Sequence, residues 1–350
     1  MITLNSNICF SFIISILFFI LIFLGIKRKD ESCVDIFNRD NTSALKGICA
    51  LIVMFHHFSQ HLIYGGDPIH VIYLYHRFGG HISVGMFLFI SGYVLTKKFL
   101  TDKNYSDAYI PKRLLRLYIP FAFCVIFQYA GTNVPLDKVF WGIITFRYYS
   151  SATQLYDPCW FMICIVYLSL ALYVAWSISH KHVGLLLFLF SIAYITVCLY
   201  SHLGGFWYDT VLCIPLGCTY CRCNMNGKFF FEQKRPLLIL CFLIFIISFI
   251  AIIHYGCIIY LQIVCSIGFV SFVFLSLEYV KFQSKFLNLI GGFSLEIFLV
   301  HSAVYNKFYT TFDTRNQFTI AIVISLSLLV AYVVHLASAA TTKYTNLFLQ

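Results

Sequence analysis

Apolar segments long enough to cross a bilayer recur along almost the whole chain, separated by short polar or charged stretches. A helix rises about 1.5 Å per residue, so about 20 apolar residues cross a hydrocarbon core of about 30 Å. Such segments are predicted at residues 8–26, 44–63, 82–100, 114–131, 159–178, 183–200, 206–223, 236–254, 257–280, 288–308 and 317–338. The pattern therefore predicts an all-α polytopic membrane protein with about eleven transmembrane helices.

Basic residues alternate between the polar segments in a way that orients these helices. Cytoplasmic loops carry an excess of Lys and Arg, and placing the N-terminus outside puts most of the 24 basic residues inside. The first apolar segment is followed, not preceded, by Lys27, Arg28 and Lys29. A cleaved secretory signal has the opposite charge order. We therefore expect a retained first helix, an extracytoplasmic N-terminus and a cytoplasmic C-terminus.

Composition excludes a soluble protein and defines one membrane domain. The chain is 60% hydrophobic and 11% charged, whereas soluble domains carry about 25% charged residues. No linker or internal repeat divides it. We expect an N-terminal helix and cytosolic linker at 1–43, a membrane domain at 44–338 and a short cytosolic tail at 339–350.

The net charge of +10 and the fourteen cysteines add little chemistry. The charges lie in scattered loops, which suits an anionic cytoplasmic leaflet and is weak evidence for a nucleic-acid partner. Most cysteines lie inside apolar helices, where they act as small hydrophobic residues. The cluster at 213–223 has no zinc spacing and no nearby histidine, so we expect no metal site.

An apolar helix with a lysine at its entrance and a histidine deep inside is the first candidate site. Lys46 and His57 are eleven positions apart, about three turns, so they share a face and lie roughly 16 Å apart along the axis. An ionisable group near mid-membrane is a functional hypothesis by default, although a histidine hydrogen-bonded to a neighbouring helix is an equal alternative. His56 points about 100° away and is expected to be structural.

Two further motifs follow along the chain. Residues 81–93 contain several small residues, including Ser91 and Gly92. Small residues permit close packing of helices; the alternative is that they form the wall of a ligand tunnel. Arg113 and Arg116 share a helix face at the predicted cytosolic side. There they bind either lipid headgroups or the phosphates of a nucleotide-bearing ligand.

The last motif places two ionisable residues in one apolar helix. Glu296 and His301 are five positions apart, so they diverge by about 140° and are not a pair on one face. Each is expected to find its own partner across the bundle, with Arg113 or Lys46 as candidates for Glu296.

Taken in order, these motifs resemble those of the acyltransferase 3 family of integral-membrane O-acyltransferases. That family has Arg, ten residues and His where this chain has Lys46 and His57, and its G-V-x-x-F-F-x-x-S-G-F-like stretch resembles Ser83–Tyr93. Its later R-x-x-R, W-F-L-like and S-x-E-I-Y-L-x-H-like motifs resemble Arg113 to Arg116, Trp160–Met162 and Ser294–His301. The resemblance covers 44–338, ten helices, with 8–26 as an addition. Lysine in the first motif keeps the charge of the family's arginine and loses its bidentate fork.

The resemblance implies an enzyme of a bacterial plasma (inner) membrane that moves an acyl group from cytosolic acyl-CoA to a sugar hydroxyl. Acetyl is the implied group, and the implied acceptor is a surface polysaccharide, its lipid-linked precursor or a glycolipid. His57 would be the general base, and Glu296 or His301 would orient it or line the acceptor path. The residues implied in binding acetyl-CoA are Lys46, Ser91, Gly92, Arg113 and Arg116.

Two other functions fit the same pattern. A transporter or flippase of a lipid-linked glycan would also need buried ionisable groups, although no inverted repeat is visible. An inactive acyltransferase-like scaffold is the other. Acyl-CoA binding or hydrolysis distinguishes an enzyme from a flippase. The pattern indicates no particular oligomeric state.

Overall fold

The computed structural model describes residues 25–28, 37–64, 75–146, 159–225, 234–309 and 317–348, together with Ile20 and Ile22. This part of the chain is almost entirely helical. Its α-helices are α2 Arg39–Tyr64, α4 Gly80–Thr101, α5 Tyr109–Tyr129, α6 Leu136–Thr145, α7 Cys159–Ile178, α8 Val183–Tyr200, α9 Cys213–Met225, α10 Lys234–Tyr255, α11 Ile259–Ser276, α12 Lys285–Gly292, α13 Ser294–Tyr309 and α14 Gln317–Phe348. Shorter elements are β1 Ile26–Arg28, the π-helix η1 Tyr75–Gly79, the 3₁₀ turn η3 Gly205–Trp207 and β2 Val280–Phe282.

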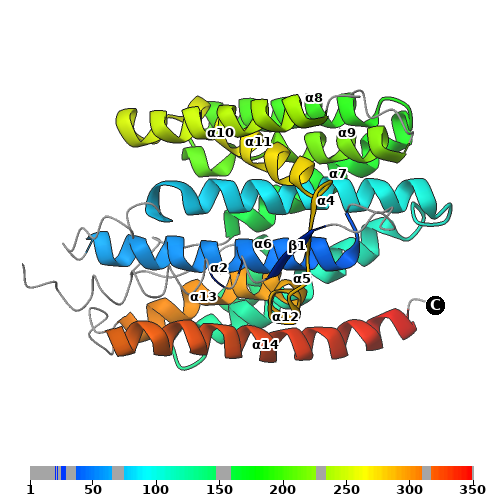
Figure 1. Ribbon diagram of the computed structural model, residues 1–350. Helices are drawn as coiled ribbons and strands as arrows, with labels where there is room; N and C mark the ends of the chain where they lie inside the picture. Colours follow the sequence, from blue (N-terminus) through cyan, green and yellow to red (C-terminus); the bar gives the residue numbers. More distant parts are fainter. Residues whose placement is uncertain are drawn as a thin grey trace, which may run out of the picture.

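The long helices lie side by side along one direction, with α10 at one edge of the bundle and α14 at the other (Figure 1). In the described residues, six helices are long and apolar enough to cross a membrane. A seventh span results if α12 and α13 form one broken span. These features confirm the expected all-α, multi-pass membrane architecture.

The predicted count of eleven spans is not confirmed, and three segments differ. The predicted span at 206–223 contains η3 and then α9, whose 13 residues extend only about 20 Å. The predicted helix at 288–308 is divided into α12 and α13, bent by 73°; the glycine pair at 291–292 explains this break. The ten-residue α6 lies between the predicted spans 114–131 and 159–178, where no helix was predicted. Most of the predicted helix 8–26 lies outside the described residues.

Glycines set the two tightest helix crossings. A side chain on Gly47 or Gly291 would fall on the backbone of the partner helix, at Leu287 or Ser43 respectively, so α2 and α12 touch backbone to backbone. Gly92 and Gly217 do the same for α4 and α9. Membrane helices approach this closely only where small residues face each other. Gly92 is therefore a packing residue in this structure.

The core extends through most of the helices, and one aromatic cluster in it lies where α4 meets α11. Tyr93 is fully buried, and its ring centroid lies 4.6 Å from that of Phe37 and 5.7 Å from that of Phe274. Such offset and tilted ring pairs stabilise packing beyond simple burial. This aromatic cluster holds the helices that carry the first two motifs in fixed register.

A two-stranded antiparallel sheet joins distant parts of the chain. Residues 26–28 of β1 pair with residues 280–282 of β2, and Asn41 Oδ1 accepts a hydrogen bond of 2.8 Å from the Phe282 amide.

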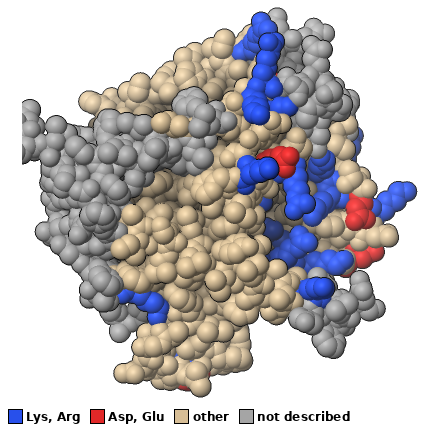
Figure 2. Space-filling view, turned by 60° about the horizontal axis from the view of Figure 1, so that its bottom comes forward, with Lys and Arg blue, Asp and Glu red and all other residues tan. Residues whose placement is uncertain are grey.

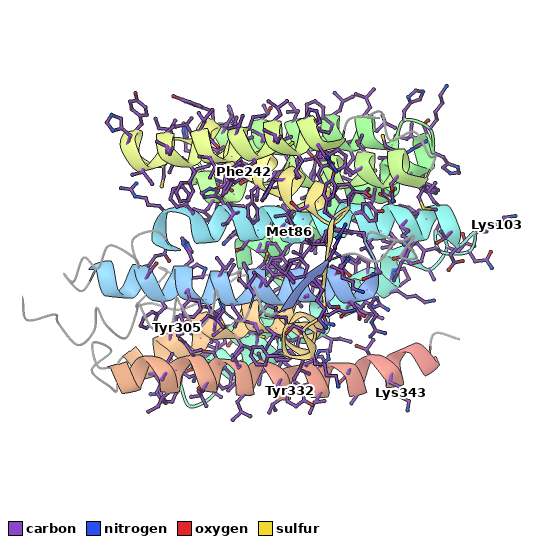
Figure 3. The ribbon with its side chains drawn as sticks, viewed as in Figure 1. Met86, Lys103, Phe242, Tyr305, Tyr332 and Lys343 are labelled. Carbon is purple, nitrogen blue, oxygen red and sulfur yellow. The ribbon has the colours of Figure 1, made fainter. Side chains whose placement is uncertain are left out.

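In Figure 2, most visible Lys and Arg side chains gather on one side. Figure 3 places Lys103 and Lys343 both at one end of the bundle. The charge asymmetry expected from the sequence is therefore present in the fold.

Candidate functional site

A cavity of about 710 Å³ lies between α2, α4, α5, α7, α12, α13 and α14, and it brings together residues from all four of the sequence motifs. Its lining includes five of the eight candidate residues, namely Lys46, Ser91, Arg113, Arg116 and Glu296. The cavity also receives Lys343 from α14. Four cationic side chains and one carboxylate therefore line it, which favours an anionic ligand.

Arg113 is held in place by α7. Its Nε donates a hydrogen bond of 3.1 Å to Ser169 Oγ, and that hydroxyl donates one of 2.6 Å to the Ile165 carbonyl. A bond at Nε fixes the plane of the guanidinium, whose remaining donors form a rigid fork suited to phosphate. Arg116, one turn further along the same helix, is exposed. Lys46 lies within electrostatic range of Arg113 and Glu296.

Glu296 forms a hydrogen bond with a residue of the last helix. Its Oε1 accepts a hydrogen bond of 2.9 Å from His335 Nδ1, and both side chains line the cavity. Glu296 is buried, so this partner offsets part of its desolvation cost. Glu296 and His301 therefore point to different helices, as their spacing predicted, although neither Arg113 nor Lys46 forms the contact.

His57 and His301 lie against each other. Their ring centroids are 4.9 Å apart with 30° between the planes. The Gln60 amide bridges the histidine pair of α2: its Nε2 lies 3.3 Å from His56 Nε2 and its Oε1 lies 2.9 Å from His57 Nδ1. With the amide in this orientation, His57 donates from Nδ1. Its Nε2 then carries the lone pair, as a base requires.

His301 is fixed by its own helix and adjoins the cavity wall. Its Nδ1 donates a hydrogen bond of 2.7 Å to the Ile297 carbonyl, so its Nε2 also carries a lone pair. Phe298 lines the cavity, and its ring centroid lies 6.2 Å from that of His301. Phe161 lies opposite at 4.5 Å from Phe298. The paired histidines are thus separated from the cavity by one aromatic layer.

The other candidates have structural surroundings. His56 packs against the start of α4, where a side chain on Gly80 would come within 2.9 Å of His56 Nε2. Trp160 belongs to an aromatic group, with its ring centroid 5.5 Å from Phe206 and 6.4 Å from Phe298. In the described part of the chain, no group of three or more His, Cys, Asp or Glu residues is placed to hold a metal.

Sequence reasoning missed Gln60 and His335. Gln60 lies three positions after His57, a spacing that places two helical side chains on neighbouring positions. His335 is an ionisable residue within an apolar helix, which is the criterion that singled out Glu296 and His301. The sequence therefore contained a signal for each of these two residues, but their partners on other helices are visible only in the structure.

Comparison with known proteins gives one match. The model of a family described as an acyltransferase domain matches residues 40–336, which is most of the chain. Comparison with curated proteins and with solved structures finds no match.

Proposed function

The chain belongs to the acyltransferase 3 family and is a membrane acyltransferase, and from that premise we propose that it moves an acetyl group from acetyl-CoA to a sugar hydroxyl. The acceptor class is a surface polysaccharide, its lipid-linked precursor or a glycolipid, in the plasma membrane of a bacterium. The observation that carries the proposal is the cationic cavity one aromatic layer away from a histidine pair.

The cavity suits the donor. Coenzyme A carries phosphates at one end and a long pantetheine arm at the other. Lys46, Arg113 and Arg116 supply positive charge for the phosphates, and Arg113 is pre-oriented by Ser169. Because basic residues gather at that end of the bundle, we assign the donor entrance to the cytosolic side.

The histidine pair suits the chemistry of transfer from a thioester to an alcohol. The sugar hydroxyl attacks the acyl carbon while His57 Nε2 takes its proton. A new C–O bond forms, the C–S bond breaks, and the coenzyme A thiolate leaves and is protonated. His301 stacks on His57 and holds its ring in place. A positioned base of this kind contributes about 10²- to 10⁴-fold in rate.

The test is mass spectrometry of lipid-linked and surface glycans from cells with and without the protein. We expect a base-labile acyl mass that is present only when the protein is present, which identifies the acyl group and the acceptor together. Unchanged acylation with altered glycan export would instead favour a transporter, which also fits buried ionisable residues.

Replacing Arg113 with Gln is expected to weaken binding of acetyl-CoA by about tenfold or more, because a charge-assisted contact to phosphate is lost. Equilibrium binding of radiolabelled acetyl-CoA to the purified protein measures this. Lys112→Gln is the matched control, because Lys112 is exposed and lies outside the cavity lining. Equal losses in both variants would contradict a specific role for Arg113.

Replacing Gln60 with Leu is expected to lower kcat about fivefold and leave KM for the donor unchanged. The variant removes the acceptor that holds the proton on His57 Nδ1, and one such hydrogen bond contributes about 1 kcal/mol. Gln60→Glu keeps an acceptor oxygen and is expected to retain most activity. Steady-state kinetics of the three proteins check this, and a silent Gln60→Leu variant would remove Gln60 from the mechanism.

A further inference from the structure

One face of α14 lines the cavity over more than two turns. The contributing residues are His335, Ser338, Ala339, Thr342 and Lys343. Their spacing of three, four, seven and eight positions is that of a single helical stripe. Most of this stripe lies beyond the family match, which ends at residue 336, and within the segment 339–350 that was expected to be a tail.

Ser338 is the buried polar member of the stripe. Its side chain is 96% buried, since the residue is only 4% exposed, and its Oγ has no hydrogen-bond partner among the described residues. Buried hydroxyl groups nearly always have a partner, and leaving one without costs about 1–3 kcal/mol. Ser338 also lines the cavity while its Oγ is covered, so a ligand in the cavity can supply that partner once the side chain turns to another staggered rotamer.

Lys343 is the charged member. It lies five residues further toward the C-terminus, about 7.5 Å along the axis, at the end of the bundle where Lys103 also lies (Figure 3). It is exposed, and it shares the cavity lining with Arg113 and Arg116. The polar hydroxyl therefore lies deeper in the cavity and the extra cation lies nearer to the basic end.

We propose that this face of α14, residues 335–343, is part of the donor site, with Lys343 binding a phosphate of acyl-CoA and Ser338 Oγ donating to an amide carbonyl of the pantetheine arm. The inference rests on the proposed function. It assigns substrate binding to the part of α14 that lies outside the family match.

The experiment compares two ligands on purified protein in nanodiscs. Labelled acetyl-CoA measures the affinity for the whole donor. Competition by S-acetylpantetheine measures the affinity for the pantetheine arm without the nucleotide phosphates. Lys343→Gln is expected to weaken acetyl-CoA about three- to fivefold and leave S-acetylpantetheine unchanged, because it removes an exposed charge contact. Ser338→Ala is expected to weaken both ligands, about fivefold, because it removes a buried hydroxyl.

Lys103→Gln is the control, since Lys103 is exposed at the same end and lies outside this cavity lining. Thermal unfolding of each variant separates loss of binding from loss of fold. Wild-type affinity in both α14 variants would overturn the inference. So would an effect of Lys343→Gln that appears only in nanodiscs containing phosphatidylglycerol, because Lys343 would then bind lipid phosphate. Wild-type protein that binds no acetyl-CoA contradicts the proposed function itself.

Discussion

Replacing His57 with Ala is expected to lower acyl transfer by about one hundred- to ten-thousandfold while the protein remains inserted in the membrane. The variant removes the imidazole whose Nδ1 is held by Gln60 and whose ring stacks on His301. His57 does not line the cationic cavity in which we propose that the donor binds. The loss should therefore appear in kcat, with donor affinity near that of the wild type.

His56→Ala is the matched control for this prediction. His56 lies at the same depth on α2 and also contacts Gln60, but its ring packs against the start of α4 instead of His301. We expect it to retain most of the acylation, measured as the base-labile acyl mass on glycans at equal membrane levels. Retained acylation in His57→Ala would contradict the assignment of His57 as the base. If acetyl-CoA turnover were also absent, a scaffold or transporter role would be favoured.

Replacing Gly291 with Ala is expected to cost about 3 kcal/mol or more of folding free energy, which is a large part of the stability of a typical domain. The added methyl group would fall on the backbone carbonyl of Ser43, which cannot move without displacing α2. We expect little folded protein in membranes and a much lower unfolding temperature for what remains. Size-exclusion profiles and thermal unfolding in detergent measure both.

The next residue provides the control. Gly292 has open space where its side chain would lie, and it is exposed. Gly292→Ala is therefore expected to fold as the wild type does. Because Gly292 lines the cavity, this control is used for stability and not for activity. Similar destabilisation by both substitutions would mean that helix propensity near the bend, and not the contact with α2, controls stability.

Four charged residues chosen from the sequence line one cavity, whereas the predicted helix count is not confirmed. Lys46, Arg113, Arg116 and Glu296 were singled out by position and charge on separate segments, and the fold brings all four to one cavity. Charged groups in apolar helices are costly, so each one signals a local requirement that can be recognised without the fold. The same criterion identified His301, which contacts His57.

What the sequence did not predict depends on contacts between distant segments. The Glu296–His335 pair joins residues on different helices, and the break at Phe293 follows from the packing of α12 onto α2 as well as from its glycines. Local hydropathy also treats 206–223 as one span, because the turn near Gly205 carries aromatic residues that score as apolar. Partner choice across a bundle and the ends of short helices are set by tertiary packing, which periodicity does not describe.

The pairing of β1 with β2 has a consequence for the order of events during synthesis. The ribosome produces Ile26–Arg28 early, but their partners Val280–Phe282 emerge only after α11 has been made. The contact spans more than two hundred positions, so it closes a very long loop and forms late. The helices between them, α2 to α11, must therefore be inserted into the bilayer before this sheet can form. The sheet can therefore form only after most of the membrane helices have been made, while α12 to α14 still follow it in the chain.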